Sequence, residues 1–102
     1  MNYTITTDTS RANGTSLRGH VKTNLETLIK KIGEPIRDHS GDGKVTCEWI
    51  LDFGDETVAT IYDWKMKETP TETYNWHIGG KGINVVEKVG SVLDLPTVRE
   101  SY

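Results

Sequence analysis

The chemistry that this sequence could perform is concentrated in residues 74–82, which read Tyr-Asn-Trp-His-Ile-Gly-Gly-Lys-Gly. Aromatic rings, an imidazole, an ammonium group and glycine N–H groups occur there within a few residues of one another. A helical pattern follows, and the N–H groups and dipole at the N-terminus of a helix attract anions. The stretch therefore predicts a site for a flat, anionic ligand. The expected ligand-binding residues are Trp64, Trp76, His77, Gly79, Gly80 and Lys81.

The glycines do not match the common phosphate-binding loops. A Walker A motif needs four residues between its first Gly and Gly-Lys, and then Ser or Thr. The dinucleotide fingerprint needs a parallel βαβ unit, which the sequence does not indicate. Residues 79–82 match the GxxG of KH domains, but that loop joins two helices. The alternative interpretation is a structural corner between a strand and a helix, with Lys81 in solvent.

Elsewhere the sequence offers little support for a catalytic or metal-binding site. His20, His39 and His77 show no metal-ligand spacing such as HxxxH or HxH. Cys47 falls in the apolar register of a strand, which favours a buried thiol over a nucleophile. An acidic cluster surrounds one hairpin and is interpreted as a solvated surface. We therefore expect no enzyme, no cofactor and no metal site.

Length and charge limit the class of protein. The chain has 102 residues, which suits a single domain. Residues 3–7 predict a short edge strand, and the stretches 1–14 and 97–102 are alternatively interpreted as flexible tails. The formal net charge is −3, from 15 acidic and 12 basic residues, which argues against broad nucleic-acid binding. A single cysteine forms no internal disulfide. We expect no membrane partner and a location in the cytoplasm.

Hydrophobic periodicity predicts helices over residues 23–32 and 82–93 and strands over 44–53, 57–64 and 74–79. Thr23 and Glu26 fit a helix-start box. These elements predict an α+β domain with two layers, in which two helices pack on one face of an antiparallel β-meander. The expected core consists of Leu25, Leu28, Ile29, Ile32, Trp49, Leu51, Ile83 and Val86. Aromatic residues on the uncovered face should be partly exposed, as binding surfaces often are.

Several motifs together resemble a group of small proteins encoded by bacteriophages, over roughly residues 15–90. They are Ser16-Leu17-Arg18-Gly19, Gly33-Glu34-Pro35, the run from Thr57 to Lys65, and Trp76-His77-Ile78-Gly79-Gly80-Lys81. The resemblance implies a protein made inside an infected host and carries no catalytic residues. The order of helix and aromatic meander is also similar to the β-lactamase-inhibitor-protein fold, whose members bind proteins on an exposed sheet.

Three functions are compatible with this context. The first is a counter-defence sponge, an oligomer that sequesters a nucleotide-derived immune signal of the host. Trp76 or Trp64 would stack on the base, and Lys81, His77 and the backbone amides of residues 79–82 would hold phosphate. The second is a protein inhibitor of a host defence complex, acting as anti-CRISPR proteins do or by mimicking nucleic acid. The third is a structural or housekeeping phage protein. The expected partner is thus a small nucleotide-like anion or a host defence protein, with a homo-oligomer left open.

Overall fold

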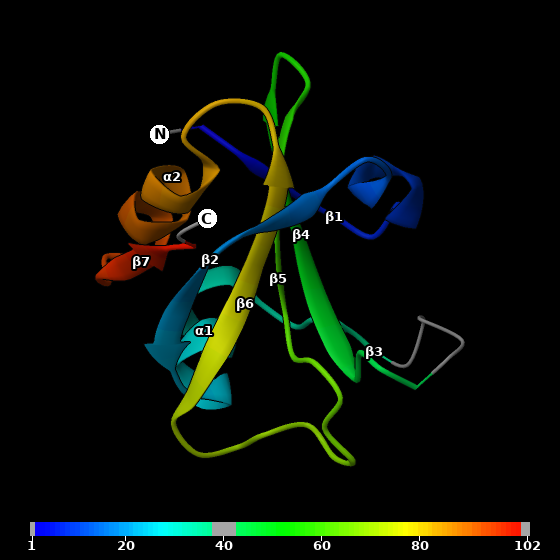
Figure 1. Ribbon diagram of the computed structural model, residues 1–102, viewed down its shortest axis with the longest axis vertical. Helices are drawn as coiled ribbons and strands as arrows, with labels where there is room; N and C mark the ends of the chain where they lie inside the picture. Colours follow the sequence, from blue (N-terminus) through cyan, green and yellow to red (C-terminus); the bar gives the residue numbers. More distant parts are fainter. Residues whose placement is uncertain (1, 38–42, 101–102) are drawn as a thin grey trace.

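The computed structural model describes residues 2–37 and 43–100, which form one layer of β-strands and one layer of α-helices (Figure 1). The expected α+β class, with two helices on one face of an antiparallel sheet, is confirmed. In chain order the elements are β1 (Thr4–Thr6), a short 3-10 helix η1 (Thr9–Ala12), β2 (Ser16–Thr23), α1 (Leu25–Ile32), β3 (Ile36–Arg37), β4 (Cys47–Gly54), β5 (Thr57–Tyr62), β6 (Tyr74–Lys81), α2 (Val85–Leu93) and β7 (Thr97–Arg99).

The sheet is larger than the predicted meander. The order β1-β4-β5-β6-β2-β7 places the β4-β5-β6 meander in the middle, and β3 pairs with one end of β4. All pairs of neighbouring strands are antiparallel. Strand β6 lies between β5 and β2, so both of its edges are hydrogen-bonded. The strand that holds the predicted ligand-binding stretch is therefore central in the sheet.

Both terminal stretches contribute a strand to this sheet, and the short edge strand predicted over residues 3–7 corresponds to β1. Strand β1 pairs with β4, and β7 pairs with β2. Segment η1 lies against β4 and β5 on the face opposite the helices. It covers Ile50, Val58 and Thr60, whose side chains are buried although they point away from the helix layer.

The two helices begin later than the sequence predicted. Helix α1 is capped by Asn24, whose Oδ1 accepts from the N–H of Thr27 at 2.8 Å, whereas Thr23 ends β2. Helix α2 begins at Val85 because Gly82 and Asn84 have φ angles of +99° and +56° and form a turn. Ile83 consequently lies outside the helix and is 72% exposed, so its expected place in the core is wrong. Val85 packs into the core instead.

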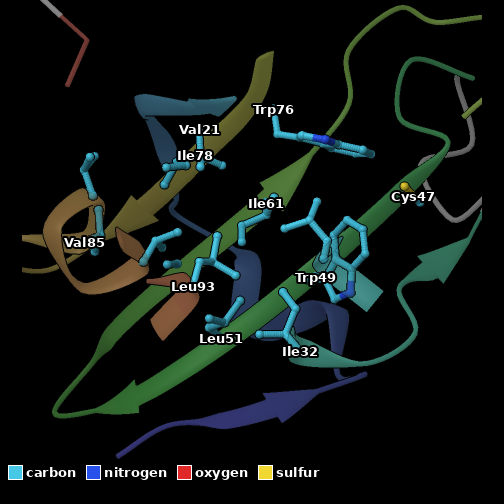
Figure 2. Close-up of a cluster of buried hydrophobic side chains, with 14 residues drawn as sticks. Val21, Ile32, Cys47, Trp49, Leu51, Ile61, Trp76, Ile78, Val85 and Leu93 are labelled. Atoms are coloured by element: carbon cyan, nitrogen blue, oxygen red, sulfur yellow. The ribbon is translucent and has the colours of Figure 1, made fainter. Parts of the chain in front are cut away.

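The hydrophobic core fills the space between the helices and the sheet (Figure 2). Leu28, Ile32, Trp49, Leu51 and Val86 are buried in it as expected, and Leu25 and Ile29 pack against its edge. Trp49 and Trp76 meet edge to face in its centre, with ring centroids 5.5 Å apart. No helix in the described part of the chain is both long and apolar enough to span a bilayer.

Candidate functional site

Trp76 is part of the core and has no face available for a ligand. Its side chain is 0% exposed, and its Nε1 donates a hydrogen bond to the carbonyl oxygen of Thr23 at 3.2 Å. Figure 2 shows its indole lying among the other buried side chains. Side chains alternate between the two faces of a strand, and residue 76 points to the helix-covered face of β6. The expectation that Trp76 stacks on a ligand is therefore wrong.

Gly79 and Gly80 lie inside β6 and do not form an open anion-binding loop. Their backbones are in register with β2 on one side and β5 on the other. A Cβ atom at Gly79 would lie 2.6 Å from Oγ1 of Thr60, and one at Gly80 would lie 2.7 Å from Cγ2 of Val85. These positions therefore need glycine because neighbouring side chains pack directly on the strand.

Lys81 reaches the N-terminal segment, away from the start of α2. Its Nζ donates to the carbonyl oxygen of Asn13 at 2.8 Å. Cavities in the described part of the chain are lined by residues other than Trp76, His77 and Lys81. Trp76 points into the core, His77 lies on the opposite face of β6, and Lys81 bonds to the N-terminal segment, so the structure does not bring these three predicted site residues together.

His77 instead belongs to a row of rings on the helix-free face of the sheet. Its ring is stacked on Tyr62, with centroids 5.4 Å apart and planes 24° from parallel. His20 lies on its other side, with centroids 4.9 Å apart. Burial of His77, followed by the nearby His20, lowers its pKa below the ordinary value of 6.5. The ring of His77 is thus neutral at neutral pH.

Tyr62 connects this row to Trp64, the second tryptophan among the predicted ligand-binding residues. The two rings meet edge to face with centroids 6.5 Å apart. Trp64 is 41% exposed, and the ammonium nitrogens of Lys44 and Lys65 lie 5.7 and 5.9 Å from its ring centre. We call these four residues, Tyr62, Trp64, Lys44 and Lys65, the Trp64 corner.

A cavity adjoins the Trp64 corner. It has a volume of about 700 Å³ and is lined by residues 65–74, which connect β5 to β6. The backbone N–H of Trp64 donates to the hydroxyl of Tyr74 at 3.1 Å, so the start of this connection is tied to the start of β6. An exposed indole, two ammonium groups and a cavity therefore lie close together at this end of the sheet.

The buried carboxylate of Asp63 holds together the two segments that carry the Trp64 corner. Asp63 is 0% exposed and accepts hydrogen bonds from the N–H and hydroxyl of Thr46, at 2.8 and 2.6 Å, and from the N–H of Cys47 at 3.1 Å. These bonds join the end of β5 to the segment that enters β4. Lys44 and Trp64 therefore lie on neighbouring segments of the chain. The N–H of Lys65 donates to the carbonyl oxygen of Lys44 at 2.7 Å and joins the same two segments.

Burial, followed by the charge of Asp63, raises the pKa of the Cys47 thiol to about 12. The thiol is consequently protonated at neutral pH and is a poor nucleophile. No group of three or more His, Cys, Asp or Glu side chains among residues 2–37 and 43–100 is arranged to hold a metal ion. His39 lies outside the described residues.

The acidic residues near the β4–β5 hairpin do not form one surface. Asp63 is buried, and Asp52 pairs with Arg11 of η1 at 2.8 Å. The hydrogen bond from the N–H of Gly54 to Asp52 lowers the pKa of that carboxyl, and Arg11 adds to the effect. Asp55 and Glu56 are exposed at the turn. This distribution gives no support to mimicry of a nucleic-acid backbone.

Sequence reasoning identified Trp64 and His77 but missed the residues that join them. Tyr62 alternates with Trp64 along the same face of the predicted strand over 57–64, and this register is the available signal. Lys65 follows Trp64 directly in the sequence, whereas Lys44 gives no local signal because the pairing of β4 with β5 brings it beside Trp64. Comparison with known proteins adds no further assignment: no protein family, curated protein or solved structure matches this chain.

Proposed function

We propose that this chain is a phage-encoded binding protein that sequesters a nucleotide-like anion of the host in the host cytoplasm, and that it binds this ligand at the Trp64 corner. The observation that carries the proposal is the exposed indole of Trp64 with the ammonium groups of Lys44 and Lys65 within 6 Å of its ring, next to a cavity of about 700 Å³.

The chemistry of the Trp64 corner suits a ligand with a flat ring and phosphate groups. An aromatic side chain stacks on any nucleobase, with a contribution of about 1–3 kcal/mol per base. Each ammonium group adds a charge-assisted hydrogen bond to phosphate, of about 1.5–3 kcal/mol. After the cost of association, two or three such contacts give a dissociation constant in the micromolar range or below.

Trp64, and not the buried Trp76, provides the surface on which the base stacks. A base stacked on the indole of Trp64 displaces one ammonium group from the ring face toward the edge of the ligand, where phosphate binds. His77 contributes through Tyr62, whose orientation it supports by stacking at 5.4 Å. No reaction is required of these residues, and the protein acts by holding its ligand.

Isothermal titration with cyclic dinucleotides and ADP-ribose derivatives tests the proposal. At least one ligand should bind to the wild-type protein, and Trp64→Ala should weaken that binding at least tenfold. Lys65→Ala should weaken it several-fold and reduce its salt dependence. Lys30→Ala is the matched control, because Lys30 is exposed on α1 and pairs with Glu26 of the same helix at 3.1 Å. Equal binding by the wild type and Trp64→Ala would contradict the site.

A second candidate function is inhibition of a host defence protein through the end of the sheet at β7. Ile83 and Val98 are 72% and 68% exposed, and a cavity of about 410 Å³ is lined by residues of β2, α2 and β7. Arg18, Arg99 and Glu87 line the cavity, so it carries charges of both signs. A protein partner that presents charged groups to this cavity and apolar side chains to the exposed Ile83 or Val98 would fit this end of the sheet.

A plaque assay on bacteria that carry defined defence systems separates the two functions. If the protein sequesters a nucleotide, Trp64→Ala should abolish protection of the phage, whereas Ile83→Asp with Val98→Asp should have no effect. The reverse pattern would support inhibition of a host protein. Protein levels measured in the same cells exclude loss of folding as the cause.

A further inference from the structure

His20 and His77 form a cross-strand pair on the helix-free face of the sheet. They are direct partners in the register of β2 and β6 and are far apart in the sequence. Their ring centroids are 4.9 Å apart, and the ring planes are inclined by 60°, so the rings are not stacked. Both side chains are partly exposed, which leaves the pair accessible from solvent.

The spacing of the two rings matches the geometry of two imidazoles on one metal ion. The metal–nitrogen distance is about 2.0–2.1 Å, and a ring nitrogen lies about 1.1 Å from its ring centre, so two rings at a roughly tetrahedral angle have centres about 5 Å apart. The observed 4.9 Å agrees with this value.

The surroundings of each ring also fit a metal ligand. Nδ1 of His20 lies 3.5 Å from a carboxylate oxygen of Glu100, so Nε2 of His20 is left for a metal. A carboxylate on the second nitrogen is the usual way in which metal-bound imidazoles are oriented. In His77, Nδ1 is buried and makes no well-aligned hydrogen bond in the described part of the chain, although the backbone of Tyr62 lies close enough to act on the ring. A buried ring nitrogen without a well-aligned partner is costly, and a bound cation would supply one.

We propose that His20 and His77 together bind one divalent cation of the kind that prefers imidazole, such as Zn²⁺, Ni²⁺ or Cu²⁺, with Glu100 as a positioning residue. Water completes the coordination, because no third protein ligand converges on the pair among residues 2–37 and 43–100. The bound ion clamps β2 to β6 and stabilises the folded protein by mass action. The cation site does not depend on the ligand proposed for the Trp64 corner, although the ring of His77 also stacks on Tyr62 of that corner.

Metal titration of the chelator-stripped protein tests the pair. The wild type should bind Zn²⁺ or Ni²⁺ with a stoichiometry of one and should melt at a higher temperature in its presence, whereas Mg²⁺ should have no effect because it prefers oxygen ligands. In a nitrogen-detected NMR spectrum of the histidine rings, Zn²⁺ should shift the signals of His20 and His77 and leave those of His39 in place.

Variants decide whether the pair is the site. His20→Gln and His77→Gln should each weaken binding at least tenfold, and His39→Gln should bind as the wild type does. Glu100→Gln should weaken binding several-fold while the same two rings still shift, as expected of a positioning residue. Unchanged affinity in His20→Gln, or the absence of any melting shift in the wild type, would overturn the proposal. Because His20 lies at the surface of the sheet, its variant is informative even if His77→Gln folds poorly.

Discussion

Trp76 and Trp64 have similar surroundings in the sequence and opposite positions in the structure. Trp76 lies in a central strand, is 0% exposed and meets Trp49 and Tyr74 edge to face, at 5.5 and 5.2 Å. Trp64 lies two residues beyond the end of β5, is 41% exposed and has lysine ammonium groups over its ring. One indole therefore stabilises the fold, and the other is available to a ligand.

The comparison shows that an aromatic residue must be judged by the strand it belongs to and the face it points to. Strand β6 is covered by helices on the side of Trp76 and carries His77 on the other side. A position just past a strand end has neither neighbouring strands nor helices to cover it. Four experiments test this contrast.

Truncation of the two indoles should give the largest difference. Trp76→Ala should lower the free energy of unfolding by about 3–5 kcal/mol, because it leaves a cavity in the core and removes the bond to Thr23. The same truncation at Trp64 should cost less than about 1 kcal/mol, as usual for surface positions. Urea denaturation of both variants measures the two values. Similar losses in the two variants would remove the contrast.

The buried carboxylate beneath the Trp64 corner should be the next most sensitive position. Asp63→Ala leaves the N–H groups of Thr46 and Cys47 without their acceptor, and we expect a loss of about 2–4 kcal/mol in the free energy of unfolding. Asp55→Ala at the exposed hairpin turn is the control and should change it by less than about 0.5 kcal/mol. A small effect at Asp63 would show that the Trp64 corner is not anchored in this way.

The glycines of β6 should behave as packing residues. Gly79→Ala and Gly80→Ala should each cost about 1–3 kcal/mol, since an added Cβ would lie within 2.7 Å of Thr60 or Val85 side-chain atoms. Asn75→Ala, on the same strand but exposed, is the control. Thermal melting of the three variants provides the measurement. If the glycine variants kept full stability and lost ligand binding, the glycines would be ligand-binding residues after all.

The rate at which Cys47 reacts with a thiol reagent is a further measure of the difference between the two tryptophans, and it needs no substitution of Cys47 itself. With a pKa of about 12, the folded thiol should react with a thiol-specific reagent at neutral pH at least about a hundredfold more slowly than a free cysteine. Trp64→Ala should leave this rate unchanged. Trp76→Ala should raise it, because a destabilised core exposes the thiol more often. Equal rates in both variants would contradict the assignment of Trp76 to the core.

The sequence by itself determined the α+β class, the positions of two helices and the three strands of the central meander. It could do so because apolar side chains at periods of about 3.6 and 2 residues are a local property of the chain. It also identified five of the buried core residues, Leu28, Ile32, Trp49, Leu51 and Val86, because each is part of such a period. The prediction that Ile83 is buried was wrong because two residues with positive φ, Gly82 and Asn84, delay the start of α2.

Only the tertiary structure decided which of the candidate site residues lie together. The pairing of β6 with strands on both sides and the helices above it buried Trp76 and occupied the backbone of Gly79 and Gly80. The same pairing placed His77 beside His20, which no spacing in the sequence indicates. Contacts between distant segments depend on strand order and register, and these follow from the burial of the whole core, which no local pattern contains.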